Sequence, residues 1–599
     1  MGSSWSACAC RCSDIPRHRK ICTAEVQYPM YVKSVLDVLK ISMLTPHEEL
    51  LSTGRLREFT PEMVVIFISH QWLGRKHPDL HMKQFRVLQA GLAHLVAGTA
   101  DLGVCFKSMA AGHSSEPSLR GEAARGLVNA FIWYDFFSVP QRFRPRRSGS
   151  HPELMTVEMR SAVLSIPAYV DRAQYFVALV PSVSHNDSPN LRCDRATWSA
   201  RGWCRTEAWV AALSTSSEPK VCILLMEDQI MIEFLPLQWL FAPPHAGEFA
   251  IESDRSMLHE LEVEVFDNHL EAVAKAGETC YARFLSAMRT HVNRAHGPQE
   301  DLDKWLLNFN FSDAHDVGED GWGPLCYAAL EGNTSVVQEL VARGANVNRG
   351  TKAAAHQVMA EAGMTPLMLA AMYIWDEGKR ASTCGTLLEL SADPCSTDDK
   401  GNTALHLTAS SAAGRETIQV LLYYGACVNA VNQADETPLF TSCFRNPTTS
   451  SEATPCIKSL LESGARLDIY NNLGWTALHI ASFLGSAADI RLLLEAQADV
   501  NQRTIETSAL LQQTTDCVTA WGTGGANKMM RDIFCELGAG TTPLMMTCIL
   551  KNESGGLELL RHRADPTIKS DIGKTAVDIA LVRGLAGDFM SRLIDAHAP

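Results

Sequence analysis

Several kinds of segment are missing from this 599-residue sequence, and each absence argues against a class of protein or of partner. No apolar run approaches the roughly 18 residues that a membrane-spanning helix needs, so we expect no segment that crosses a bilayer. The N-terminus lacks the apolar core of a secretory signal. The net charge is −14 and no domain-wide basic surface is apparent, which argues against nucleic acid as the main partner.

The cysteines are numerous, but they do not form a recognisable set. None of the 18 belongs to a CxxC pair, and no group of cysteines and histidines has the spacing of a metal site. Because a secretory signal is also lacking, we expect reduced thiols in an intracellular protein, with no bound metal. A site built from His185, Cys193 and Cys204 is the alternative, although their spacing is not specific for a metal.

The composition is that of ordinary globular domains, with 46% hydrophobic and 20% charged residues. A chain of this length is expected to form two or more domains, each with its own core. Changes of pattern along the chain predict four parts. These are a disordered tail over residues 1–27, an α/β domain over 28–245, a helical connector over 246–318 and a repeat array over 319–599.

The tail carries three features that are typical of lipid-anchored proteins. Gly2 follows the initiator methionine, and Ser6 stands where N-myristoylation favours a hydroxyl. Cys8, Cys10 and Cys12 come next as acceptors for a second acyl chain, and basic residues follow them. One acyl chain binds membranes only marginally, and a second signal makes binding stable, so we expect a cytoplasmic protein held at a membrane surface. The alternative is a disordered tail that matches the pattern by chance.

Residues 28–245 alternate between strand patterns and helix patterns, which predicts parallel strands joined by right-handed crossovers. The predicted strands are continuous apolar runs over residues 63–68, 130–137, 175–180 and 221–226. The predicted helices cover residues 31–44, 82–96 and 155–173, with a further helix beginning at Gly202. Residues 98–125 are rich in small residues and are expected to be an insertion.

A candidate site lies where the predicted strands end, because ligands of parallel sheets bind beyond the carboxyl ends of the strands. Ser69, Trp72 and Asp135 fall at such ends. The helix that begins at Gly202 starts on the same rim and carries Glu207 near its N-terminus, where the helix dipole is expected to hold the carboxylate ionised. Alternatively, Glu207 is only a favourable N-terminal acid, and the nearby tryptophans belong to the core.

Short motifs in this domain resemble those of Toll/interleukin receptor (TIR) domains. Residues 67–72, Phe-Ile-Ser-His-Gln-Trp, resemble the first box of the family. Residues 203–207, Trp-Cys-Arg-Thr-Glu, resemble the Trp-Cys-x-x-Glu motif of plant-type members. Residues 132–141 are similar to the related heterokaryon-incompatibility domain. The resemblance covers residues 60–230 and implies a flavodoxin-like α/β fold.

In catalytic TIR domains, the glutamate that Glu207 matches is needed to split NAD⁺ into nicotinamide and an ADP-ribose product. A carboxylate suits this step, because breaking the nicotinamide–ribose bond leaves positive charge on the ribose. The resemblance implies a tryptophan stacked on a base and an arginine at the pyrophosphate. The predicted cofactor contacts are Ser69, Trp72, Asp135, Arg142 and Trp203. Many relatives of these domains only self-associate. The alternative is that these residues are structural: the tryptophans lie in the core, the arginines lie in a solvated loop and Asp135 caps a turn.

Residues 319–599 repeat one motif seven times, at intervals near 33 residues with insertions. Each copy opens with Thr-Pro-Leu or a variant, in which Thr caps a helix and Pro suits its first turn. The copies open at residues 323, 365, 403, 437, 476, 542 and 575. Ser508 is expected to open a decayed eighth copy in the longest interval, and the last copy is expected to cap the array.

This pattern is identified as the ankyrin repeat, which implies an α-solenoid whose concave surface binds a protein partner. His406 and His479 are expected to bond neighbouring loops rather than a ligand. The connector has helical spacing over residues 258–295 and is expected to pack on the first repeat. We predict a signalling scaffold whose repeats bind a protein and whose TIR-like domain mediates assembly. The alternative is an NAD⁺ hydrolase that uses Glu207.

Overall fold

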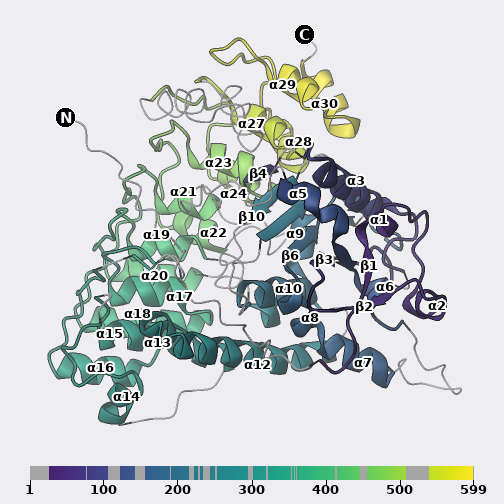
Figure 1. The fold of residues 1–599 in the computed structure, drawn as a ribbon. Helices are drawn as coiled ribbons and strands as arrows, with labels where there is room; N and C mark the ends of the chain where they lie inside the picture. Colours follow the sequence, from purple (N-terminus) through teal and green to yellow (C-terminus); the bar gives the residue numbers. More distant parts are fainter. Residues whose placement is uncertain are drawn as a thin grey trace, which may run out of the picture.

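The computed structural model describes residues 26–597 apart from short internal segments. Those segments are residues 76, 101, 105–121, 142–155, 189–190, 215–220, 227–229, 234–242, 250–251, 294–300, 319–320, 353, 356–357, 359, 412–413, 445–454 and 508–538. Gly2, Cys8, Cys10, Cys12, Arg142 and Ser508 therefore lie outside the described residues. An α/β module occupies one side of the molecule and a curved array of helices occupies the other (Figure 1). Among the described helices, none is long and apolar enough to cross a membrane.

The α/β module is built on one mixed sheet. Its described strands lie in the order β2-β1-β5-β3-β6-β9-β10-β4. The four central strands β5, β3, β6 and β9 are parallel, which confirms the sequence prediction of a parallel sheet. The strands are β1 (Tyr31–Ser34), β2 (Arg57–Glu58), β3 (Val65–His70), β4 (Leu102–Val104), β5 (Phe131–Trp133), β6 (Tyr175–Leu179), β9 (Val221–Leu225) and β10 (Ile230–Glu233).

Helices cover both faces of this sheet, because alternate residues of each strand point to opposite sides. On one face, Phe67 of β3 packs in a cluster with Tyr169 of α8 (Ile166–Arg172) and with residues of α10 (Gly202–Ala212). On the other face, Ile66 packs in a cluster with Leu88 of α3 (Lys83–Ala97). The central strands are thus buried on both sides, as their continuous apolar runs predict.

Four predictions for the α/β module were wrong in detail. The strand predicted over 130–137 ends at Trp133, and the helix α6 (Asp135–Ser138) follows it. The helix predicted over 31–44 begins as β1, and only α1 (Val35–Val38) is helical, because antiparallel pairing with β5 outweighs the local helical spacing. The helix predicted over 155–173 is divided into α7 (Val157–Leu164) and α8, where Pro167 cannot donate a backbone hydrogen bond. The expected insertion contributes β4, which extends the sheet beside β10.

The connector consists of α12 (Ser253–Lys275), α13 (Thr279–Asn293) and α14 (Leu302–Asn308). The single helical pattern predicted over 258–295 is interrupted at Gly277, whose φ of 79° suits glycine at a helix end. Figure 1 shows α12 running from beneath the sheet toward the first repeats. There α13 packs on α15 and α14 packs on α16, so that these two helices cover the open end of the array.

The described residues of the array form seven helix pairs that stack in chain order. The first helices are α15 (Pro324–Glu331), α17 (Pro366–Tyr373), α19 (Ala404–Ala409), α21 (Pro438–Cys443), α23 (Ala477–Leu484), α27 (Pro543–Ile549) and α29 (Ala576–Val582). The second helices are α16 (Thr334–Ala342), α18 (Glu377–Glu389), α20 (Arg415–Tyr423), α22 (Pro455–Glu462), α24 (Ala487–Glu495), α28 (Glu553–Arg561) and α30 (Gly587–His597). One hydrophobic core runs through all of them.

The helix pairs on either side of the longest interval between copies pack directly on each other. The helix α23 packs directly on α27, and α24 packs directly on α28. The backbone N–H of Thr504 also donates to the carbonyl of Thr541, at 2.9 Å, across the same junction. These two pairs are immediate neighbours, and the decayed eighth copy predicted to open at Ser508 lies outside the described residues.

Candidate functional site

The end of β3 carries a buried hydrogen-bonded chain of three side chains. Ser69 Oγ donates to Glu207 Oε2 at 2.5 Å, and the Trp198 indole N–H donates to Ser69 Oγ at 3.0 Å. Glu207 belongs to α10, and Trp198 belongs to α9 (Arg195–Ala200). The sequence analysis missed Trp198, although a buried indole N–H needs a hydrogen-bond acceptor and so marks a polar neighbour.

Glu207 is buried, and this burial sets its protonation state. The side chain faces β3, and only 9% of the residue is exposed. Burial raises the pKa of Glu207 to about 8, the charge of Asp135 acts in the same direction, and the hydrogen bond from Ser69 opposes them. The prediction that the helix dipole keeps this carboxylate ionised was wrong, because Glu207 lies beyond the first turn of α10 and desolvation dominates.

A second cluster lies at the same strand end, around Asp135 at the start of α6 (Asp135–Ser138). His70 Nε2 lies 2.8 Å from Asp135 Oδ1, and the Trp72 indole N–H donates to Asp135 Oδ2 at 2.6 Å. The ring of His70 stacks on Tyr134 at 4.1 Å between centroids. Burial alone would raise the pKa of the Asp135 carboxyl, but His70 and the Trp72 hydrogen bond lower it overall.

The strand end therefore holds two carboxyl groups whose environments push their pKa values apart. Glu207 is mostly protonated at neutral pH, whereas Asp135, with 29% of its side chain exposed, is ionised. Pairs of this kind divide acid and base roles in many hydrolases. Ser69 and His70 are adjacent on β3 and hold one carboxyl group each.

The predicted site residues are not all brought together. Ser69, Trp72, Asp135 and Glu207 meet at the end of β3, as the strand pattern predicts. Trp203 lies elsewhere, because its indole N–H donates to Asp254 Oδ2 of α12 at 3.1 Å. The stacking of Trp203 on a base stays a prediction.

The N-terminus of α10 is covered by residues 243–249 of the same chain, which we call the strap. The backbone N–H of Gly202 donates to the Glu248 carbonyl at 2.9 Å, and the N–H of Glu248 donates to Ala200 at 2.7 Å. A Cβ at Gly202 would lie 2.0 Å from the ring of Phe249, so this approach requires glycine. The strap thus takes the place that an anion occupies at many helix N-termini.

The opposite end of α10 belongs to the core of the helical array. Trp209 is buried and stacks on Phe266 of α12 at 6.2 Å between centroids. Both residues lie in the same hydrophobic cluster as the repeats. One helix therefore carries Glu207 at the sheet and a large aromatic contact with the connector helix α12, in a cluster that continues into the array.

The two repeat histidines have structural roles, as predicted. His406 Nδ1 lies 2.9 Å from Thr403 Oγ1, and its Nε2 lies 2.9 Å from the Glu436 carbonyl of the next unit. His479 makes the equivalent contacts with Thr476 and with the carbonyl of Gln502. Burial lowers the pKa of each histidine to about 4, so both rings are neutral at physiological pH.

The two cysteines named in the metal alternative are buried thiols. Cys204 Sγ lies 3.7 Å from the His70 carbonyl, and burial raises the pKa of both Cys193 and Cys204. Over the residues that the structure describes, no group of three or more His, Cys, Asp or Glu side chains is arranged to hold a metal ion.

Comparison with known proteins finds similarity in the array. The family model for ankyrin repeats in three copies matches residues 292–398 and 414–504. Ankyrin repeat and SOCS box protein 16 of Homo sapiens is 32% identical over 194 residues, a match that spans 30% of this chain and 40% of that protein. The family match thus identifies ankyrin repeats over these two ranges.

Two solved structures are also similar to this chain. The ankyrin repeat domain of human ASB11 is 20% identical with a TM-score of 0.34. The ankyrin repeat domain of Bcl-3, a member of the IkappaB protein family, is 22% identical with a TM-score of 0.32. Each match covers 46% of this chain and 99% of the solved chain.

Proposed function

We propose that this protein is a scaffold whose ankyrin repeats bind a protein partner through the hairpin loops between units. The observation that carries the proposal is a ladder of backbone hydrogen bonds that joins successive loops. The N–H of Gln433 donates to Lys400, that of Asn472 to Ala434 and that of Ile505 to Gly474, at 2.9, 2.8 and 3.2 Å. Such a ladder holds the loops in a fixed row, and ordered surfaces lose little entropy on binding.

Apolar side chains project from these loops and favour a protein partner over a small molecule. Val431, Ile505 and Ile572 are 49%, 44% and 49% exposed. All three stand in loops that precede the first helix of a unit. Apolar groups along one ordered edge can be buried by a partner surface at little conformational cost.

Replacing Ile505 and Ile572 together by serine is expected to reduce partner capture by about tenfold, because two apolar contacts at the loop edge are lost. The measurement is affinity capture of the full-length protein from cells, with quantitative mass spectrometry. Tyr423→Ser is the matched control, since Tyr423 is 85% exposed but lies on the second helix α20. Equal capture by the double variant and the wild type would contradict the proposed surface.

For the α/β module, we infer a TIR-like domain that mediates assembly. If the four parallel strands are numbered among themselves along the chain, β3 is the first, β5 the second, β6 the third and β9 the fourth. Their order across the sheet is then 2-1-3-4, which is the order of flavodoxin-like sheets. A second candidate is NAD⁺ hydrolysis. It is favoured by the position of Glu207 beside the ends of β3 and β6, where the direction of chain winding reverses and ligands of such sheets bind.

Nicotinamide release from NAD⁺ by the full-length protein distinguishes these roles. A reaction that needs the Glu207 carboxylate is expected to increase roughly tenfold from pH 6 to pH 7 and to level off near the carboxyl pKa of about 8. Glu207→Gln is expected to abolish it. If no nicotinamide is released while sedimentation velocity shows concentration-dependent oligomers, the assembly role stands and the enzymatic role fails.

We also propose that the N-terminal tail attaches the protein to the cytoplasmic surface of a membrane. It is supported by the acylation pattern at Gly2 and by the cysteines at positions 8, 10 and 12. Membrane partitioning of a Gly2→Ala variant is the corresponding measurement, and unchanged partitioning would remove this part.

A further inference from the structure

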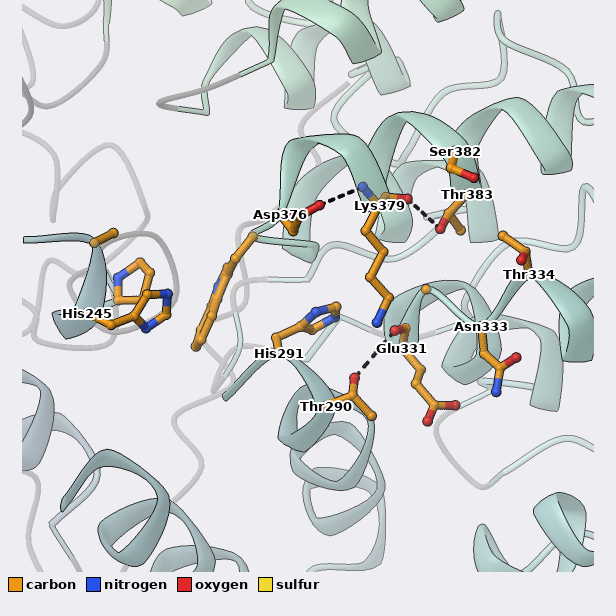
Figure 2. A pocket seen from close by; sticks show the side chains of 14 residues that line it. His245, Thr290, His291, Glu331, Asn333, Thr334, Asp376, Lys379, Ser382 and Thr383 are labelled. Atoms are coloured by element: carbon orange, nitrogen blue, oxygen red, sulfur yellow. Dashed lines mark hydrogen bonds between the residues drawn. The ribbon is translucent and has the colours of Figure 1, made fainter. Parts of the chain in front are cut away.

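A cavity of about 850 Å³ lies where the α/β module meets the first two repeats (Figure 2). One wall is the strap, through Pro243 and the short helix η2 (Pro244–Ala246). The other walls are the end of α13, the turn between α15 and α16, and the start of α18. Cavities of this size hold metabolite-sized molecules and occur preferentially at domain interfaces.

Lys379 places a cation in this cavity. Its methylene chain lies across Gly332, where an added Cβ would come within 2.6 Å of Lys379 Cε. Figure 2 shows the side chain extending from α18 toward Glu331 and Thr290. Over the described residues, the ammonium makes no hydrogen bond or ion pair. Burial lowers the pKa of Lys379, although the negative charges of Glu331 and Asp376 act to raise it. The buried ammonium therefore carries a desolvation cost that an entering anion would offset.

The same cavity offers hydrogen-bond acceptors. His291 is 7% exposed, and its Nε2 lies 2.8 Å from the Leu330 carbonyl, which makes Nε2 the protonated nitrogen. Nδ1 is then an acceptor, and burial lowers the pKa of His291 to about 4, which keeps the ring neutral. Asp376 uses Oδ1 to cap α18, through the N–H of Lys379 at 2.7 Å, and its second oxygen is another acceptor.

An aromatic surface and two hydroxyl groups complete the lining. Trp375 lies between His245 and His291, with ring centroids 6.0 and 6.2 Å away. Thr334 at the start of α16 and Ser382 in the second turn of α18 contribute hydroxyl groups. The cavity thus combines one unpaired cation, several acceptors and an indole, which is a set that suits a molecule with both an anionic group and hydroxyl donors.

We propose that this cavity binds a polyhydroxylated ring that carries a phosphate group, with the phosphate at Lys379 and the ring hydroxyls at Asp376 and His291. Trp375 offers an apolar surface to the ring. This chemistry is shared by free sugar phosphates and by nucleotides. The inference does not depend on the functions proposed for the loops or for Glu207.

Such a ligand would contact the α/β module and the repeats at once. Pro243 lines the cavity, and its carbonyl accepts from Arg205 Nη1 of α10 at 3.4 Å. The strap is therefore fixed to α10 on one side and open to the ligand on the other. Binding is expected to stabilise the contact between the two parts.

Isothermal titration calorimetry of the full-length protein tests this site with ribose 5-phosphate, AMP, ribose and inorganic phosphate. Ribose 5-phosphate and AMP are expected to bind at least about tenfold more tightly than ribose or phosphate alone, because only they satisfy both halves of the cavity. A preference for AMP over ribose 5-phosphate identifies nucleotides as the source, and equal affinities identify sugar phosphates.

Lys379→Met is expected to weaken binding of both phosphorylated probes by about tenfold, since methionine keeps the unbranched chain over Gly332 and removes the charge. Lys379→Arg, which keeps the charge, is expected to stay within about threefold of the wild type. Lys458→Met on α22 is the control, because Lys458 is exposed and does not line the cavity. Unchanged binding in Lys379→Met, or no saturable binding of either probe at millimolar concentration, overturns the proposal.

Discussion

Replacement of Glu207 by glutamine is expected to remove a large pH dependence from the stability of the protein. The pKa of Glu207 is 4.5 in an unfolded chain and about 8 in the folded protein. Its contribution to stability is therefore fully present below pH 4.5 and is lost as the pH rises toward 8. Over that window the free energy of unfolding falls by about 1.4 kcal/mol per pH unit, or up to about 4 kcal/mol between pH 5 and pH 8.

Glutamine keeps an oxygen that accepts the hydrogen bond from Ser69, and it cannot ionise. The stability of Glu207→Gln relative to the wild type is thus expected to improve steadily from pH 5 to pH 8, as measured by chemical denaturation at each pH. Glu558→Gln is the matched control, because Arg491 lowers the pKa of Glu558 to about 2 and its titration lies below this window. Parallel curves for Glu207→Gln and the wild type would show that the carboxyl group is ionised throughout.

Trp209→Ala is expected to cost about 3–5 kcal/mol, the range for removing a buried aromatic side chain. Over the described residues, the Trp209 indole N–H makes no hydrogen bond, so the loss is one of packing against Phe266 and its neighbours. Because this contact joins α10 to the core of the array, its removal is also expected to uncouple the two parts. Calorimetry should then show two separate unfolding transitions, with a single transition in the wild type.

Leu421→Ala is the control that separates the loss of stability from the uncoupling of the two parts. Leu421 is fully buried on α20, in the third helix pair of the array, and its truncation is expected to cost about 2–5 kcal/mol. The expected result is a lower unfolding temperature with one transition retained. If Trp209→Ala also keeps one transition, the coupling between the parts does not depend on this aromatic contact.

The repeats and the parallel strands could be predicted because their signals are local. A threonine cap, a proline in the first turn and a leucine that enters the core occur together in three units, and the other units carry variants of this motif. The four central strands are buried on both faces, so each is a continuous apolar run. By contrast, β1 is short and has helical spacing, and only its pairing with β5 makes it a strand.

The chemical state of the candidate site could not be predicted, because it depends on distant residues. Glu207 is protonated as a consequence of burial against β3 beside Ser69, and Ser69 is 138 residues away in the chain. The cavity at Lys379 is likewise assembled from the strap, the connector and two repeats, and no sequence motif marks the residues that line it. Sequence spacing identifies the ends of strands, but it does not measure how much water reaches them.

The sharing of α10 between the sheet and the array has a consequence for signalling geometry. Because Trp209 of α10 packs in the same cluster as the repeats, a protein bound to the loop row would be held at a set distance and angle from the end of β3. Each repeat rotates the array by a small constant angle. Adding or deleting one unit would therefore move the bound protein around the sheet by a defined angle. The number of repeats then sets the position of the bound protein relative to the α/β module.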